Sequence, residues 1–433
     1  MQRVSSRDRL EQALARIADP SGEGARACLT VYRETARAEA DAADARARLD
    51  RPLGPLDGAI VSIKDLFDVK GDVTRAGSRV LGGEGKAAAA DAPAVARLRA
   101  AGAVVVAKTN MSEFAFSGVG ANPHFGTPGN PLDRARVPGG STSGGAVAVA
   151  DNMCDIAIGS DTGGSTRIPA ALCGIVGWKP SRQRVPTDGA FPLSFTLDSI
   201  GPMARTVANC ALADAVMAGA PPVRPEGADL AGLRVGIVQG LPFENVDNDV
   251  AAAWADAAGR LGRAGVRFSD ERIALLDEMV QVNAVGGFAP AEAYAIHRER
   301  IAREGDGIDP NIRFRIERGA KMSAADYVGM VQARRRLVRA MDARIAPLDA
   351  IVLPTCPIVA PRIEDCVKSD EFGRNNLLLL RNTAPVNFFD LCAVSLPLTC
   401  RGGLSAGLML VARNGQDRRL LDIAAGVERL LAG

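Results

Sequence analysis

Histidine is almost absent from this chain of 433 residues, which contains only His124 and His297. We therefore expect no structural zinc site, because such sites are built from clustered cysteine and histidine ligands. The eight cysteines are scattered along the chain and form no C-x-x-C pair. Scattered thiols in a large domain are typical of a reducing compartment, so the sequence predicts a cytoplasmic protein.

The chain also lacks a long uncharged apolar run, so no segment is expected to span a bilayer. Its first residues, Met1–Asp8, contain no apolar stretch of the kind found in secretory signals. An excess of one charge is missing too, because 52 basic residues nearly balance 50 acidic residues. The densest basic cluster, Arg334–Arg336, is expected on the solvated face of a helix. We therefore expect neither a membrane nor a nucleic acid as partner.

The residues that are present, 47% hydrophobic and 24% charged, suffice for a large globular core. Strand-like and helix-like segments alternate along the chain, which predicts the α/β class. No repeat, low-complexity segment or flexible linker divides the chain, so we expect a single large domain. The predicted strands are 58–64, 103–107, 348–353 and 406–411, and the predicted helices are 7–18, 26–49, 92–101, 249–265, 286–304, 322–345 and 418–431.

Two glycine-rich segments, Val137–Gly145 and Gly159–Ala170, place hydroxyl side chains among glycines. Glycine allows positive φ angles and close approach of the backbone to a ligand. Consecutive N–H groups in such a turn can converge on an anion, as the oxyanion hole of an acyl-transfer enzyme requires. By composition alone, ordinary loops are the favoured interpretation of both segments.

A serine nucleophile in these segments would need a base other than histidine. No G-x-S-x-G sequence is present, His297 lies in a helical run, and His124 lies in a turn-like segment. Lys64 follows the apolar stretch Ala59–Ile63, and burial would lower its pKa enough for the neutral amine to act as a base. The alternatives are a lysine that faces solvent or one that pairs with a nearby aspartate, Asp65 or Asp68.

An ordered set of segments resembles the amidase signature hydrolases, most strongly from Gly54 to Arg205 and over most of the chain. The spacing of 24 residues between Ser141 and Ser165 agrees with that family. Thr142 and Thr166 depart from its usual residues without removing a catalytic position. The matching segments are Ser62–Asp65, Pro138–Thr142, Gly163–Ala170, Cys173–Ser181 and Asp198–Arg205.

The resemblance implies one amidase signature domain over residues 1–433, with a mixed, twisted β-sheet covered by helices on both faces. Residues 1–50 would form a helical N-terminal layer, and residues 54–205 the catalytic core. Residues 206–433 would supply the rest of the sheet, further helices and segments of the substrate pocket.

The resemblance also implies a role for each matching residue. Ser165 would attack the amide carbonyl, and Ser141, in a cis peptide geometry, would relay the proton to neutral Lys64. Backbone N–H groups of Thr162, Gly163, Gly164 and Ser165 would form the oxyanion hole. No metal or organic cofactor would be needed.

Three neighbouring residues would support this machinery. Thr142 keeps the hydroxyl of the serine that it replaces and would support Lys64. Asp161 and Arg167 flank the nucleophile, and we interpret them as a structural pair that holds its loop.

These inferences predict an amidohydrolase that acts on a small-molecule amide, with a homodimer as a possible assembly. Two alternatives stay open: the glutaminase (A-type) subunit of a tRNA-dependent amidotransferase, and an inactive binding or scaffold protein on the same fold. Specificity should arise from four variable segments, in which Tyr327 and the region Arg313–Arg318 are candidates to meet a polar or acidic group. These segments are 113–125, 187–195, 285–327 and 377–389, with Phe114, Phe116, Phe191 and Phe195 as candidates for an apolar acyl pocket.

Overall fold

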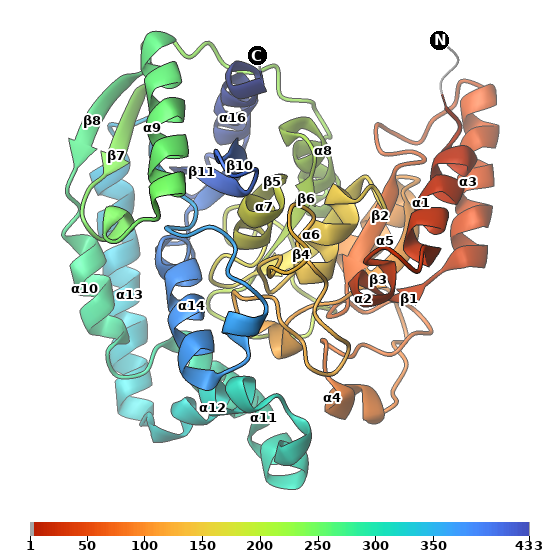
Figure 1. Cartoon of the computed structure of the whole chain (residues 1–433), viewed down its shortest axis with the longest axis horizontal. Helices are drawn as coiled ribbons and strands as arrows, with labels where there is room; N and C mark the ends of the chain where they lie inside the picture. The colour runs from red at the N-terminus through yellow and green to blue at the C-terminus, as the bar shows by residue number, and fades with distance from the viewer. Residues whose placement is uncertain (1–3, 433) are drawn as a thin grey trace.

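A computed structural model describes residues 4–432 (Figure 1). Met1–Arg3, the first part of the segment expected to lack a secretory signal, and Gly433 lie outside the described residues. The centre of the molecule is one sheet of 11 strands. In spatial order these are β1 (Cys28–Val31), β3 (Val104–Thr109), β2 (Ile60–Lys64), β4 (Ile156–Asp161), β6 (Ser199–Ala204), β5 (Val176–Lys179), β10 (Cys392–Thr399), β11 (Ser405–Ala412), β9 (Ala350–Pro354), β7 (Arg234–Val238) and β8 (Arg267–Glu271).

The sheet is mixed, with parallel pairs toward both ends and antiparallel pairs between them. Strands β3, β2 and β4 run parallel to one another, and so do β9, β7 and β8. The strands from β6 to β11 pair antiparallel with their neighbours. Figure 1 shows β1–β3 at one end of the molecule and β7 and β8 at the other.

Helices cover both faces of the sheet. The short helices are α2 (Gly24–Ala27), α4 (Arg79–Gly83) and α15 (Ala384–Phe388), and 3-10 turns lie at Glu113–Ala115, Leu241–Phe243, Gly305–Gly307, Arg318–Lys321 and Glu364–Cys366. The longer helices are α1 (Ser6–Ala18), α3 (Arg33–Arg48), α5 (Pro93–Ala100), α6 (Ser143–Ala150), α7 (Arg167–Cys173), α8 (Val207–Ala218), α9 (Asn248–Arg263), α10 (Leu275–Asn283), α11 (Phe288–Glu304), α12 (Pro310–Glu317), α13 (Ala324–Ile345), α14 (Ser369–Arg381) and α16 (Asp417–Ala432).

The strands bury side chains on both faces, because successive side chains of a strand point to opposite sides. On β2, Val61 and Ile63 join the core under α5, α8, α9 and α16, whereas Ile60 joins the opposite core under α1 and α6. At the other end of the sheet, α10, α13 and α15 cover that second face. The predicted α/β class and the single domain with a helix-covered mixed sheet are confirmed.

Most of the predicted elements are present, but the helix predicted over 26–49 is wrong in its first part. Residues Cys28–Val31 form β1, which pairs antiparallel with β3, and the helix begins only at Arg33. Thr30 and Val31 are β-branched, and the free edge of β3 supplies backbone partners that no local pattern reveals. The N-terminal layer is therefore not wholly helical, since it adds an edge strand to the sheet.

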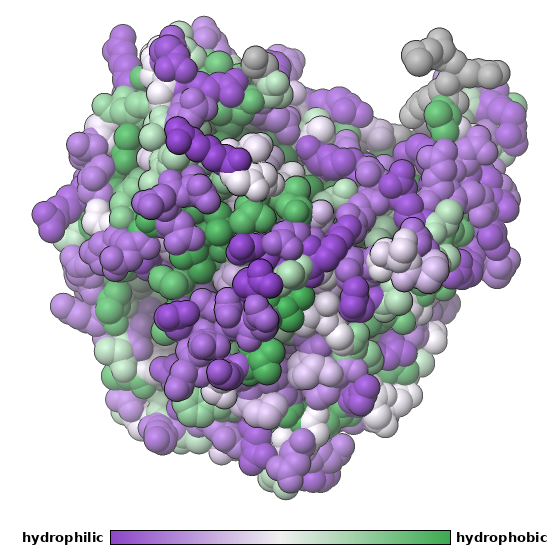
Figure 2. Space-filling model, in the orientation of Figure 1, coloured by the Kyte–Doolittle hydropathy of each residue, from purple (hydrophilic) through white to green (hydrophobic). Residues whose placement is uncertain are grey.

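The face of the molecule in Figure 2 is mainly hydrophilic, and this includes the region of α1 and α3. Apolar residues on this face gather between the positions of α9 and α14. No helix within residues 4–432 combines the length and the apolar character needed to cross a bilayer. All eight cysteines are free and buried.

Candidate active site

Lys64 is the last residue of β2 and lies beside the end of β4. Because the two strands are parallel, their carboxyl ends meet at one edge of the sheet, where sites in α/β proteins commonly form. The Lys64 side-chain nitrogen Nζ lies 2.8 Å from Ser141 Oγ and 2.9 Å from Ser160 Oγ. The pairing of β2 with β4 brings Lys64 beside Ser160, and the segment before α6 adds the Ser141 hydroxyl.

The Lys64 side chain is fully buried and has no carboxylate oxygen within 4.0 Å in the described part of the chain. Asp65 instead accepts a hydrogen bond from the Gly77 amide, and Asp68 accepts one from Thr74. The alternatives of a solvent-facing lysine and of a pair with either aspartate are therefore wrong. Burial lowers the pKa of Lys64 to about 7, against the opposing attraction of Asp161 and Asp198.

Ser141 and Ser165 are brought together by the two glycine-rich segments. The Gly140–Ser141 peptide bond is cis, and the Thr142 amide donates to the Ser165 carbonyl at 3.3 Å. Ser141 is fully buried, whereas Ser165 lines a cavity and its hydroxyl makes no hydrogen bond within residues 4–432. The Ser165 hydroxyl is therefore open to a molecule in that cavity.

The second hydroxyl on Lys64 belongs to Ser160 rather than to Thr142. Thr142 Oγ1 is buried without a hydrogen-bond partner in the described residues, and its side chain packs against Gly159, so its expected support of Lys64 is not made by a hydrogen bond. Ser160 was missed, although it lies in a segment that the sequence singles out. Ser160 is next to last in β4, which pairs in parallel with β2, and no local pattern in the sequence reveals this pairing.

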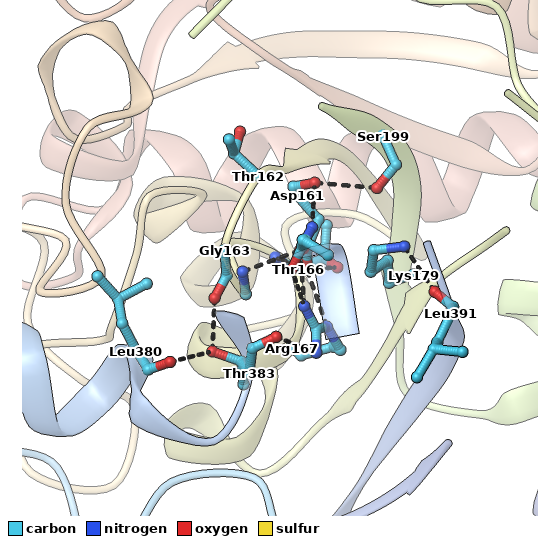
Figure 3. Close-up of polar contacts among 12 residues, drawn as sticks. Asp161, Thr162, Gly163, Thr166, Arg167, Lys179, Ser199, Leu380, Thr383 and Leu391 are labelled. Carbon is cyan, nitrogen blue, oxygen red and sulfur yellow. Dashed lines mark hydrogen bonds and ion pairs between the residues drawn. The ribbon is translucent and has the colours of Figure 1, made fainter. Parts of the chain in front are cut away.

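Asp161 and Arg167 form a fully buried ion pair beneath the loop that carries Ser165 (Figure 3). Arg167 Nη2 lies 2.8 Å from Asp161 Oδ1, and Nε lies 3.1 Å from Oδ2. Asp161 also accepts hydrogen bonds from the amides of Gly164 and Thr166 and from the Thr166 hydroxyl. The carboxylate thus fixes the backbone on both sides of Ser165.

Asn387 completes this network from α15, more than two hundred residues away in sequence. Its side-chain amide donates to the backbone carbonyl and the carboxylate of Asp161, and its oxygen accepts from Arg167. Burial alone would raise the pKa of Asp161, but the Arg167 charge and these hydrogen bonds hold it well below its usual range. No sequence signal could have found Asn387, because nothing local distinguishes it from other polar residues.

We expect Arg167→Met to lower the free energy of unfolding by about 3–5 kcal/mol, because it leaves the buried Asp161 charge without its partner. Thermal or denaturant unfolding followed by circular dichroism measures this loss. Arg336→Met is the matched control, since Arg336 pairs with Glu278 on the surface, where such a pair contributes about 1 kcal/mol or less. Equal stability of the two variants would refute the structural role of the buried pair.

The predicted oxyanion hole needs one correction. The Gly164 amide donates to Asp161 Oδ1 at 2.9 Å, so it is occupied within the protein. The amides of Thr162, Gly163 and Ser165 have no acceptor in the described part of the chain. Gly164 matters instead for its shape, because its φ is +134° and an added Cβ would lie 2.2 Å from Thr383 Oγ1.

Asp198 ties a second loop to the site and was not predicted as a site residue. It accepts a hydrogen bond from the Thr162 hydroxyl and two from the amides of Leu193 and Ser194. Burial raises its pKa to about 6, against the opposing effect of these hydrogen bonds. The loop that contains Leu193 therefore keeps a fixed position next to the Ser165 loop.

The cavity that Ser165 lines has a volume of about 220 Å³. All four segments predicted to set specificity contribute to its wall, but the predicted phenylalanines do so unequally. Phe116 lines the cavity, whereas Phe114 and Phe191 pack against His297 and Phe195 is exposed. Tyr327 does not line the cavity, and its hydroxyl donates a hydrogen bond to Glu292. The wall is mainly apolar and contains one charged side chain, that of Arg315.

Within residues 4–432, no group of three or more histidine, cysteine, aspartate or glutamate side chains is placed to hold a metal ion. The arrangement at Ser165 consists of hydroxyls, main-chain amides and one buried amine. These groups are suited to nucleophilic attack on a carbonyl carbon and to stabilisation of the resulting oxyanion.

This chain is similar in sequence and in structure to proteins of known family. The family model described as Amidase matches residues 8–421. The 2-amino-5-chloromuconic acid deaminase of Comamonas testosteroni is 34% identical over 92% of this chain and 86% of its own length. The A-type subunit of the glutamyl-tRNA(Gln) amidotransferase of Anaeromyxobacter sp. (strain K) is 35% identical over 99% of this chain and 93% of its own. The crystal structure of an amidase superposes with a TM-score of 0.88 at 31% identity, covering 99% of this chain and 96% of that one.

Proposed function

The chain belongs to the amidase family, whose hydrolases act on amide C–N bonds, and from this we propose that it forms an acyl-enzyme on Ser165 with Ser141 and Lys64 as the proton relay. The reaction converts a carboxylic amide and water into a carboxylic acid and ammonia or an amine. The chain's own residues supply every group that the proposal uses.

The observation that carries the proposal is the Lys64 amine, fully buried and 2.8 Å from Ser141 Oγ. With a pKa of about 7, a large fraction of this amine is neutral at neutral pH. A neutral amine can accept a proton, whereas an ammonium group held by a carboxylate cannot. Burial, without an acidic partner in the described part of the chain, therefore supports Lys64 as the base.

The proton transfers balance in two stages. Ser165 Oγ forms a bond to the carbonyl carbon as its proton passes to Ser141, and the Ser141 proton passes to Lys64 Nζ. Lys64 then returns a proton through Ser141 to the amide nitrogen, and the C–N bond breaks. Water then attacks the acyl carbon while its proton passes through Ser141 to Lys64. The proton returns through Ser141 to Ser165 Oγ as the C–O bond to Ser165 breaks, and the acid is released.

The developing oxyanion accepts hydrogen bonds from the amides of Thr162, Gly163 and Ser165. Each such donor contributes about 3 kcal/mol to the stability of the transition state in comparable enzymes. Gly164 shapes this turn, and its own amide donates a hydrogen bond to Asp161 instead of to the oxyanion. The ion pair beneath the loop holds the three donors in place before the substrate arrives, so no reorganisation accompanies the reaction.

A panel of small carboxamides, scored by ammonia release and by acid formation, tests the proposed reaction. We expect equal molar amounts of acid and ammonia from at least one member of the panel. Ester substrates of the same acids should also be cleaved, since both react through the same acyl-enzyme. If no amide or ester is hydrolysed, although the protein is folded, the proposal is refuted.

A second candidate function is the glutaminase subunit of a tRNA-dependent amidotransferase. It is favoured by the 35% identity to the A-type amidotransferase chain of Anaeromyxobacter over 99% of this chain. The same Ser165 site would then hydrolyse glutamine and release ammonia to a partner. Hydrolysis of glutamine and of the carboxamide panel by the isolated chain separates the two functions. Activity of the isolated chain on carboxamides favours the free-standing amidase, whereas glutamine hydrolysis that appears only in complex with a partner favours the amidotransferase subunit.

A further inference from the structure

Arg315 lines the same cavity as Ser165 but has no role in the proposed proton relay. It lies on α12, which packs against α11 and α14 (Figure 1). The other lining residues include no aspartate or glutamate. The wall of the cavity therefore contains one positive charge and no negative charge.

The Arg315 guanidinium has no acceptor within residues 4–432. Its Nε atom is buried without a hydrogen-bond partner, and it forms no ion pair. Arg313, two residues earlier on the same helix, is paired with both Glu317 and Asp306. A buried N–H group without an acceptor is costly, so its presence beside a cavity indicates that the acceptor comes from outside the chain.

The orientation and charge of Arg315 are well defined. Its guanidinium stacks on the Phe116 ring, 4.6 Å from the ring centroid. Burial and the nearby Arg318 lower the pKa of Arg315 to about 10, which leaves it positively charged at neutral pH. Stacking uses the flat face of the group and leaves its N–H edge free for a planar acceptor.

We propose that Arg315 binds a carboxylate on the acyl part of the substrate, so that the enzyme selects acidic amides. This inference rests on the proposed function of Ser165. The guanidinium edge matches a carboxylate, which accepts two parallel N–H hydrogen bonds. Apolar side chains such as Leu193, Phe388 and Leu380 line the same cavity and suit a hydrocarbon body joining the two polar ends.

The size of the cavity limits this substrate. Its volume of about 220 Å³ is smaller than that of pockets for drug-sized ligands, which occupy about 300–1,000 Å³. The part of the acyl group that lies inside the cavity is therefore small, as in the monoamide of a short dicarboxylic acid.

Two series of amides with equal carbon numbers test the proposal. Succinamate, glutaramate and adipamate have a terminal carboxylate, whereas butanamide, pentanamide and hexanamide end in a methyl group. We expect kcat/KM to be about 100-fold higher for the best carboxylated amide than for its neutral counterpart, as for a charge pair shielded from water. In Arg315→Met this preference should be lost, because kcat/KM should fall far more for the carboxylated amides than for the neutral ones.

Two further variants identify the cause of a lost preference. Arg313→Met is the matched control and should keep the wild-type preference, because its partners lie on the surface. Arg315→Lys keeps the charge without the planar edge and should retain part of the preference. A fall in kcat/KM of the same size for both series in Arg315→Met, or a wild-type enzyme without preference, would overturn the proposal.

Binding to Ser165→Ala separates this inference from the proposed function. Calorimetric titration with glutaramate and with pentanamide requires no turnover. We expect glutaramate to bind more tightly to Ser165→Ala than to Ser165→Ala/Arg315→Met, with no such difference for pentanamide. If the wild type hydrolyses neither series but this difference is present, the proposed function fails and the Arg315 site stands. Equal binding of glutaramate to both variants refutes the Arg315 site, whatever the activity of Ser165.

Discussion

Replacement of Ser165 by alanine is expected to lower kcat by about 10⁶-fold, the loss found when the nucleophile of a serine hydrolase is removed. The reason is that no other hydroxyl replaces it: Ser141 is fully buried, whereas Ser165 faces the cavity. The measurement is the initial rate of ammonia release at saturating amide. The fold should be retained, because the loop is held by Asp161 and Arg167 rather than by the Ser165 hydroxyl.

Ser143→Ala is the matched control for this variant. Ser143 is also a buried serine of the glycine-rich segments, and its hydroxyl has no hydrogen-bond partner in the described residues. Removal of an unsatisfied hydroxyl is nearly neutral or stabilising, so its activity should stay within about threefold of the wild type. Wild-type rates in Ser165→Ala would exclude this residue as the nucleophile.

Replacement of Lys64 by methionine is expected to lower kcat/KM at pH 7 by about 10⁴-fold, the upper end of the range for general acid–base catalysis. Methionine keeps the length of the side chain but cannot accept the proton from Ser141. Part of the activity should return in alkali, where hydroxide replaces the missing base. Rates across a pH series, with the unfolding temperature of each variant, measure this effect.

The stability of Lys64→Met provides the control for misfolding. Burial of the amine opposes the charged form, as its lowered pKa shows. An apolar side chain of similar length removes that cost, so the variant should unfold at a temperature equal to or above that of the wild type. An inactive variant that is as stable as the wild type assigns the loss to chemistry, whereas full activity at pH 7 would exclude the amine as base.

Much of the fold could be predicted because it depends on local patterns. The apolar runs that became β2, β3, β9 and β11 are short and buried on both faces, and the helices α9, α13 and α16 have long amphipathic repeats. Strand β1 was not predictable in this way. Its four residues are a strand only because β3 offers a free edge, and a pairing between distant segments leaves no local pattern.

In the candidate site, too, residues in distinctive local segments could be predicted, whereas residues that matter through contacts with distant segments could not. An apolar strand pointed to Lys64 and two glycine-rich segments contained Ser141 and Ser165, but the roles of the two serines came from the resemblance to the amidase signature hydrolases. Ser160 and Asn387 were not, because their contacts with Lys64 and Asp161 depend on strand order and on a helix near the end of the chain. The hydrogen bond from the Gly164 amide to Asp161 could not be predicted from the sequence either, since it depends on where the Asp161 carboxylate lies in the fold.

The central claim is that Lys64 is a neutral base that activates Ser165, and the pH dependence of Ser165 labelling by a fluorophosphonate tests it most directly. We predict that the labelling rate of the wild type rises with pH, with an inflection near the Lys64 pKa of about 7, because protonated Lys64 cannot accept a proton. Lys64→Met should be labelled slowly and without that inflection, and peptide mass spectrometry should locate the adduct on Ser165. A rate independent of pH in the wild type, the same profile in Lys64→Met, or an adduct on another residue would contradict the claim.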